Sequence, residues 1–349
     1  MARERGAPRL TRDDVERTVD ALALRAPRIA TRFGWLSGAL LLAVLIIVST
    51  HIAEERELAR LLAGAEPFWL LGAALLQLLT YACASAVWQR ALAYSGGALR
   101  LRDLLSLGLA KLFTDQALPS VGMSGTLLVV RGLQRRGVSR TAAVAAMLTG
   151  LVAFYLGYLI AILAAAGVLA RHGEMHPLIV VPIALVGALA AGTPLAIFVL
   201  RRRAQNHAPR FFERWPGARD VVAALREMPA GTLFAPRLVM ETTLLQLAIF
   251  VLDAGTLHLC LRAVGSPAPA PIAFASFIVA SVVSSLSWMP GGLGAFEGSS
   301  VALLHLQGVP IEGALAATLL LRGMTFWLPM IPGFGVARRE AAGAREEAR

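Results

Sequence analysis

Long apolar segments set the strongest limit on how this chain can fold. Several of them reach the roughly 20 residues that a helix needs to cross the hydrocarbon core of a bilayer. Six crossing helices are predicted, at 33–50, 68–93, 141–170, 178–200, 238–261 and 313–336. With 57% hydrophobic and only 16% charged residues, a soluble chain of 349 residues would lack polar surface. We therefore predict an all-α polytopic membrane protein.

Two further apolar segments, 104–130 and 272–306, are interrupted by residues that break or charge a helix. These residues are Lys111, Asp115, Pro119 and Gly122 in the first segment, and Pro290, Gly291, Gly292, Gly294 and Glu297 in the second. Proline cannot donate a helical hydrogen bond, and glycine favours bends and close backbone approach. Broken backbone at membrane depth needs cover from protein or a water-filled cavity. Each segment is predicted to form a re-entrant hairpin that lines a site.

The distribution of arginine predicts the orientation. Both flanks of 104–130 are basic, so a hairpin that enters and leaves from the cytoplasm keeps both clusters on one side. On this topology most of the 33 Lys and Arg residues are cytoplasmic. The net charge of +11 then needs no nucleic acid to explain it. The location predicted is a bacterial-type cytoplasmic membrane.

This topology divides the chain into a cytoplasmic N-terminal segment, a transmembrane domain and a cytoplasmic tail. The boundaries predicted are 1–32, 33–337 and 338–349, with a cytoplasmic loop at 201–237 inside the transmembrane domain. Both termini are expected in the cytoplasm.

The two broken segments show signs of an internal repeat. A shift of 171 residues, the separation of Pro119 from Pro290, also places Gly137 and Val138 on Gly308 and Val309. The repeat halves cover about 104–170 and 272–336. The first hairpin is expected to open to the cytoplasm and the second to the outside, so the copies are inverted. Inverted repeats are typical of transporters whose site lies near the midplane of the membrane.

Three sequence motifs resemble a known family. LP-x(2)-G in the first half, PGGLGAFE with the later GVP, and LLLRGMTFWLP at 319–329 are similar to the flippase-like family that includes the membrane part of bacterial lysylphosphatidylglycerol synthases. The resemblance covers about 33–338 and implies a membrane protein that moves or presents lipids. Aminoacylated phosphatidylglycerol and polyprenyl- or glycolipid-type substrates are associated with different members.

The sequence departs from that family in two respects. The printed chain ends at Arg349 without the soluble domain that attaches the amino acid, so we expect a transporter-like protein and not an enzyme. Gly125 and Thr126 also stand where some relatives carry an acidic residue near the first break.

Arg322 and Glu297 are the leading site candidates. A lone guanidinium in mid-span is costly and usually faces the protein interior. Arg322 is expected either to hold a lipid phosphate by bidentate hydrogen bonds or to be a fixed partner for Glu297 or Asp253. Glu297 has several possible roles: to titrate, to pair with Arg322, to bind a headgroup cation, or to cap the helix that follows the glycines.

The first hairpin and the 238–261 helix supply further candidates. Lys111 and Asp115 lie four residues apart, so on a helix they share a face and can neutralise one another. Alternatively Lys111, the only lysine of the chain, contacts a phosphate. Asp253 lies deep in its helix and is a third acidic candidate. His172, Glu174 and His176 match no metal-site spacing, and neither a metal nor a cofactor is predicted.

The leading hypothesis is a lipid translocase that moves a phospholipid or lipid-linked headgroup through a polar cavity between the two hairpins. Arg322 and Lys111 would neutralise the phosphate, while Glu297 and Asp253 would engage a cationic group or a coupling proton. An ion-coupled secondary transporter of a small solute remains open. So does a non-catalytic accessory subunit of a lipid-modifying or glycosyl-transfer system, whose enzyme would then be the partner.

Overall fold

The computed structural model describes residues 60–95, 97–117, 123–174, 176–206, 233–287 and 289–346, and within these ranges it contains helices and no strand. This confirms the all-α class. The predicted N-terminal segment 1–32, the first predicted span 33–50 and most of the loop 201–237 lie outside the described residues, as do Pro119 and Gly122.

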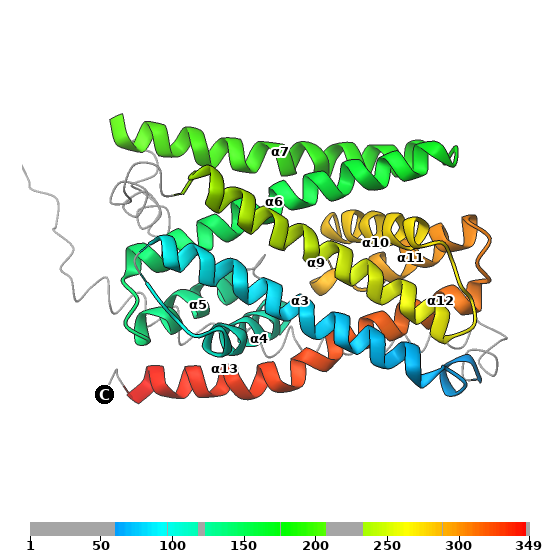
Figure 1. Cartoon of the computed structure of the whole chain (residues 1–349), viewed down its shortest axis with the longest axis horizontal. Coiled ribbons are helices and arrows are strands. Elements are labelled where there is room, and N and C mark those ends of the chain that lie inside the picture. The colour runs from blue at the N-terminus through cyan, green and yellow to red at the C-terminus, as the bar shows by residue number, and fades with distance from the viewer. Residues whose placement is uncertain are drawn as a thin grey trace, which may run out of the picture.

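Five helices of the described chain are long and apolar enough to cross a membrane. They are α3 (Pro67–Tyr94), α6 (Arg140–Arg171), α7 (Pro177–Asn206), α9 (Pro236–Ala263) and a continuous run formed by α12 (Ile311–Arg322), the π-helical η3 (Gly323–Trp327) and α13 (Leu328–Glu346). These five correspond to the predicted crossings that fall within the described residues. In Figure 1, α3 and α9 run side by side in opposite directions.

Local sequence explains where these helices begin and which face they leave uncovered. Pro67 and Pro236 occupy the start of α3 and α9, where a missing N–H costs nothing. Ser139 caps α6 by accepting a hydrogen bond from the Ala142 N–H at 3.2 Å. The exposed side chains of α3 include Phe68, Leu71, Leu75 and Leu78, which repeat at helical spacing. That apolar face is suited to contact with lipid.

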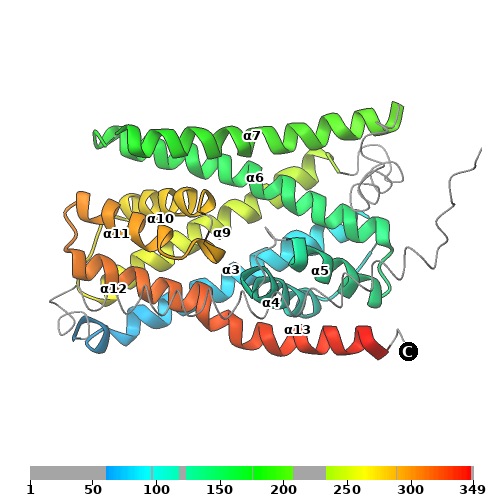
Figure 2. The same cartoon turned by 180° about the vertical axis from the view of Figure 1, so that it is seen from behind.

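Each broken segment forms two short helices that pack against each other. The first consists of α4 (Leu101–Ala117) and α5 (Met123–Arg135), and the second of α10 (Ala270–Ser285), the 3-10 turn η2 (Pro290–Gly292) and α11 (Ala295–Leu306). Figures 1 and 2 show the two pairs toward opposite ends of the molecule. The η2 turn also contacts α4, so the break of the second segment reaches the first.

The main core lies where α6, α9, α10, α11 and α12 meet. Small residues allow these helices to approach closely, as expected for packing in membranes. At Gly157 of α6, an added Cβ would lie 3.2 Å from the Gln246 Cβ of α9. The core therefore brings the second broken segment against the long helices.

The C-terminal helix extends further than predicted. The last crossing is predicted to end at 336, and α13 continues to Glu346, into the segment 338–349 that is predicted as a cytoplasmic tail. Glu340 accepts hydrogen bonds from Arg136 at 2.7 Å and from Arg135 at 3.3 Å, which tie α13 to the end of α5. These ion pairs and the alanine-rich sequence of the segment favour a helix here.

Candidate functional site

The break between α10 and α11 depends on three glycines in left-handed conformations. Gly291 and Gly292 have φ of 64° and Gly294 has φ of 79°, a region that other residues enter only at a cost. Gly292 also lies against α10, because a Cβ added to it would stand 1.6 Å from the Ser284 Oγ. The turn can therefore fold back on α10 only with glycine at position 292.

Glu297 caps the helix that follows this turn. Its Oε2 accepts a hydrogen bond of 2.6 Å from the backbone N–H of Gly294, the residue that precedes α11. An acid at this position satisfies an otherwise unpaired N–H and complements the helix dipole. The predicted capping role is confirmed.

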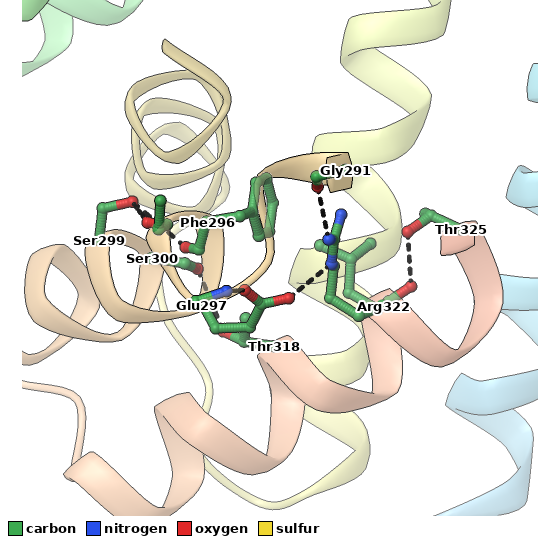
Figure 3. A network of polar contacts seen from close by, with 11 residues as sticks. Gly291, Phe296, Glu297, Ser299, Ser300, Thr318, Arg322 and Thr325 are labelled. Atoms are coloured by element: carbon green, nitrogen blue, oxygen red, sulfur yellow. Dashed lines mark hydrogen bonds and ion pairs between the residues drawn. The ribbon is translucent and has the colours of Figure 1, made fainter. Parts of the chain in front are cut away.

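Arg322 closes the site from the end of α12. Its Nε donates to the Glu297 Oε1 at 2.6 Å, and its Nη2 donates to the Gly291 carbonyl at 2.8 Å (Figure 3). The guanidinium carbon lies 5.1 Å from the ring centre of Phe296 and 4.7 Å from that of Phe326. Arg322 thus links the glycine turn, α11 and α12. Of the two partners considered from the sequence, Glu297 is the one it contacts.

This ion pair is well shielded. The side chains of Arg322 and Glu297 are 11% and 17% exposed. One turn away, the hydroxyls of Ser300 and Thr318 lie 3.1 Å apart and join α11 to α12 (Figure 3). The pair is therefore held on two packed helices, and either charge would be costly if its partner left without a replacement.

The first hairpin carries a second ion pair at its break. Lys111 Nζ binds the Asp115 carboxylate along α4, as the four-residue spacing predicted. The Asp115 Oδ1 also accepts a hydrogen bond from the Gly125 N–H of α5 at 3.0 Å. One carboxylate therefore joins the cation, α4 and the start of α5 across the break.

The two hairpins reach a similar arrangement from different sequence positions. Under the 171-residue shift Thr126 stands opposite Glu297, so the first copy seemed to lack an acid. In the structure, the carboxylate of the first hairpin belongs to Asp115, which precedes the break of that hairpin. Glu297 follows the break of the second hairpin. In both cases a carboxylate accepts from a backbone N–H after the break and pairs with a cation.

Replacing Asp115 with alanine is expected to destabilise the first hairpin by about 1–3 kcal/mol, because it leaves the Gly125 N–H and the Lys111 charge without this partner. Thermal unfolding of the purified protein in detergent would measure the change. Asp103→Ala, which removes an acid from the first turn of the same helix, serves as the control. Equal unfolding temperatures for the two variants would contradict the assigned role.

Asp253 belongs to a separate polar group between α3 and α9. Its Oδ1 accepts a hydrogen bond from the Thr80 Oγ1 at 3.3 Å, and Gln77 and Tyr81 of α3 lie beside it. The Tyr81 hydroxyl donates to the Met324 carbonyl in the π-helical η3 at 3.2 Å. These three α3 residues are not among the candidates predicted from the sequence, although their spacing at i, i+3 and i+4 marks a polar face in an apolar helix.

The arrangement brings together cations and carboxylates that can exchange partners. Among the described residues, no three His, Cys, Asp or Glu side chains are grouped so that they could hold a metal ion. Of the three residues His172, Glu174 and His176, the His172 Nδ1 lies 2.8 Å from the Val168 carbonyl. The chemistry that the site can perform is the exchange of ionic and hydrogen-bonding partners.

Comparison with known proteins identifies the family. A stretch of 89 residues is 32% identical to a UPF0104 membrane protein of Methanothermobacter thermautotrophicus, and this match covers 26% of each chain. The sequence also matches the lysylphosphatidylglycerol synthase TM region over residues 34–333, which includes both broken segments and all five described long helices up to the first third of α13. The chain therefore belongs to the family of lysylphosphatidylglycerol synthase transmembrane regions.

Proposed function

We propose that this membrane protein is a lipid translocase that moves a phospholipid or lipid-linked headgroup between two oppositely oriented re-entrant hairpins. The observation that carries the proposal is the ion pair at the break of each hairpin, Lys111 with Asp115 and Arg322 with Glu297. Charges at membrane depth are costly and usually mark a pathway for a polar substrate.

The element boundaries support an internal repeat. Under the 171-residue shift, the starts of α3, α4, α5 and α6 fall within two residues of the starts of α9, α10, α11 and α12. The opposite directions of α3 and α9 support an inverted relationship between the two copies. Inverted repeats let one half rock against the other so that a site opens to each side in turn.

The ends of α5 and α11 support the same relationship in atomic detail. Gly137 has φ of 80° and Gly308 has φ of 87°. The next residue in each case, Val138 or Val309, donates its N–H at 3.1 Å to the carbonyl five residues earlier. Both helices thus end in the same glycine-dependent motif, at positions that the shift superposes.

Partner exchange gives the proposed transport step. A lipid phosphate can take the place of a carboxylate on Arg322 or Lys111, so the cation keeps a partner throughout. Glu297 and Asp115 retain the backbone N–H groups of Gly294 and Gly125 while the phosphate is bound. The cation therefore keeps a counter-ion throughout, and the displaced carboxylate keeps one backbone donor, which offsets part of the cost of losing its cation.

We keep the membrane orientation that the arginine distribution of the sequence predicts. The arginines of the α5–α6 connection, of the end of α7 and of α13 mark the proposed cytoplasmic end of the molecule. Cysteine labelling at Ser124 and Gly298, in a background without Cys83 and Cys260, tests this placement. Reaction of both cysteines from one side alone would refute the opposed hairpins.

Reconstitution in liposomes tests transport itself. We expect the wild-type protein to equilibrate a headgroup-labelled phospholipid between leaflets, and we expect Arg322→Gln and Lys111→Met to slow it at least about tenfold, since a hydrogen bond to a charged group contributes about 1.5–3 kcal/mol. Arg237→Gln removes an arginine from an exposed ion pair with Glu241 and is the matched control. Folded Arg322→Gln and Lys111→Met variants that move lipid at the wild-type rate would reject the site.

A further inference from the structure

Among the residues that the structure describes, the carboxylate of Asp253 has only neutral partners. Thr80 donates to it at 3.3 Å, and the Gln77 amide lies beside both the carboxylate and the Tyr81 hydroxyl. Tyr81 is the titratable neighbour. This differs from Asp115 and Glu297, each of which pairs with a cation.

Arg90, the charged residue of α3, lies 3.8 Å from Glu241, and Arg262 of α9 lies over the Trp69 ring. The other helices that pack against α9 bring no counter-charge to this group. The charged residues of α6 are Arg140 and Arg171 at its two ends, and α10 contains none. In α12, Glu312 lies in the first turn, and Arg322 is bound to Glu297 and Gly291. An ionised Asp253 would thus stand in the membrane interior without a cation among the described residues, which is a costly state.

Gln77 gives a second, independent indication. Its side chain is 5% exposed, yet its Oε1 has no hydrogen-bond partner among the described residues. Buried polar atoms are nearly always paired, so this oxygen lacks a donor. A half-turn of the amide exchanges its oxygen with its nitrogen. Gln77 can therefore donate to an ionised Asp253 and accept from a protonated one.

We propose that Asp253, with Gln77 and Thr80, forms a proton-binding site that loads and releases one proton in each transport cycle. The proton comes from water on one side of the membrane, forms an O–H bond on Asp253, and returns to water on the other side. Tyr81 connects this site to the π-helical η3 through the Met324 carbonyl, two residues from Arg322. The coupling role rests on the proposed lipid transport, whereas proton binding does not.

Infrared difference spectroscopy of the purified protein tests proton binding without any transport. Lowering the pH is expected to produce the carbonyl stretch of a protonated carboxylic acid that Asp253→Asn abolishes. Gln77→Leu should keep the band but change its frequency, because the acid loses a hydrogen-bonding partner. Glu241→Gln, on the same helix, should leave it unchanged. A wild-type spectrum without a band that depends on Asp253, or a band that responds to sodium at constant pH, would overturn the proposal.

A lipid assay with a pH gradient tests coupling. With the membrane potential clamped by potassium and valinomycin, one pH unit can bias the distribution of a labelled lipid by up to about tenfold per proton. Wild-type protein should produce such a bias, and Asp253→Asn should equilibrate the lipid without it. Wild-type transport that ignores the gradient would reject coupling but leave the proposed function intact. A wild-type protein that moves no lipid would reject the function, and the infrared band would then decide proton binding alone.

Discussion

Replacing Glu297 with alanine is expected to destabilise the protein by about 3–5 kcal/mol, because it leaves the largely shielded Arg322 charge without a counter-ion. Arg322 would keep only its hydrogen bond to the Gly291 carbonyl and its contacts with the rings of Phe296 and Phe326. The same change removes the acceptor for the Gly294 N–H. Unfolding of the detergent-solubilised protein by heat and by denaturant would measure the loss.

A double-mutant cycle separates the charge from the packing. Glu297→Gln with Arg322→Met removes both charges, while glutamine can still accept from the Gly294 N–H. We expect this pair to recover most of the stability, since replacing a buried ion pair by neutral groups is often close to neutral. Transport should nevertheless stay impaired, because no cation remains for the phosphate.

Arg237→Ala provides the comparison for an ion pair at the surface. The Arg237 side chain is 78% exposed, and an exposed pair contributes only about 0–1 kcal/mol. If Glu297→Ala lowered the stability no more than Arg237→Ala, the shielded pair would not hold the second hairpin together.

The sequence was sufficient to predict the helical class, the long helices and the cap at Glu297. Apolar length predicts a membrane helix because an unpaired backbone is excluded from lipid. Glu297 could be placed because an acid three residues after Gly294 stands where the first N–H groups of a helix need an acceptor. These are local signals, and each depends on a short stretch of chain.

The partner of Arg322 and the acid of the first hairpin depended on tertiary packing. Glu297 and Arg322 are separated by the turn between α11 and α12, so the sequence left Glu297 and Asp253 equally available. The repeat pointed to Thr126, whereas the carboxylate comes from Asp115 on the other side of the break. A carboxylate can accept a hydrogen bond from the same backbone N–H whether it precedes or follows the break. A comparison of residues 171 positions apart finds only residues that occupy equivalent positions in the two copies.

Gly292→Ala is expected to cost about 2–5 kcal/mol, combining overpacking with a left-handed conformation for a residue that has a Cβ. The added Cβ would stand 1.6 Å from the Ser284 Oγ and 3.1 Å from its Cα, so moving the hydroxyl alone cannot relieve the contact. The turn would have to move away from α10 and carry the Gly291 carbonyl with it. Arg322 would then lose one of its two anchors, and lipid transport should fall with stability.

Two neighbouring glycines provide matched controls measured by the same thermal unfolding. Gly294 has φ of 79° but no atom within 4 Å of an added Cβ, so Gly294→Ala should cost only the conformational part, about 1–2 kcal/mol. Gly298 lies inside α11 with equally open space, and Gly298→Ala should be stabilising by up to about 1 kcal/mol. Ser284→Gly in the Gly292→Ala background should recover the stability that is lost to the steric clash, because it removes the Oγ and Cβ that the new methyl group meets. A Gly292→Ala protein as stable as Gly294→Ala would show that the turn does not need its close approach to α10.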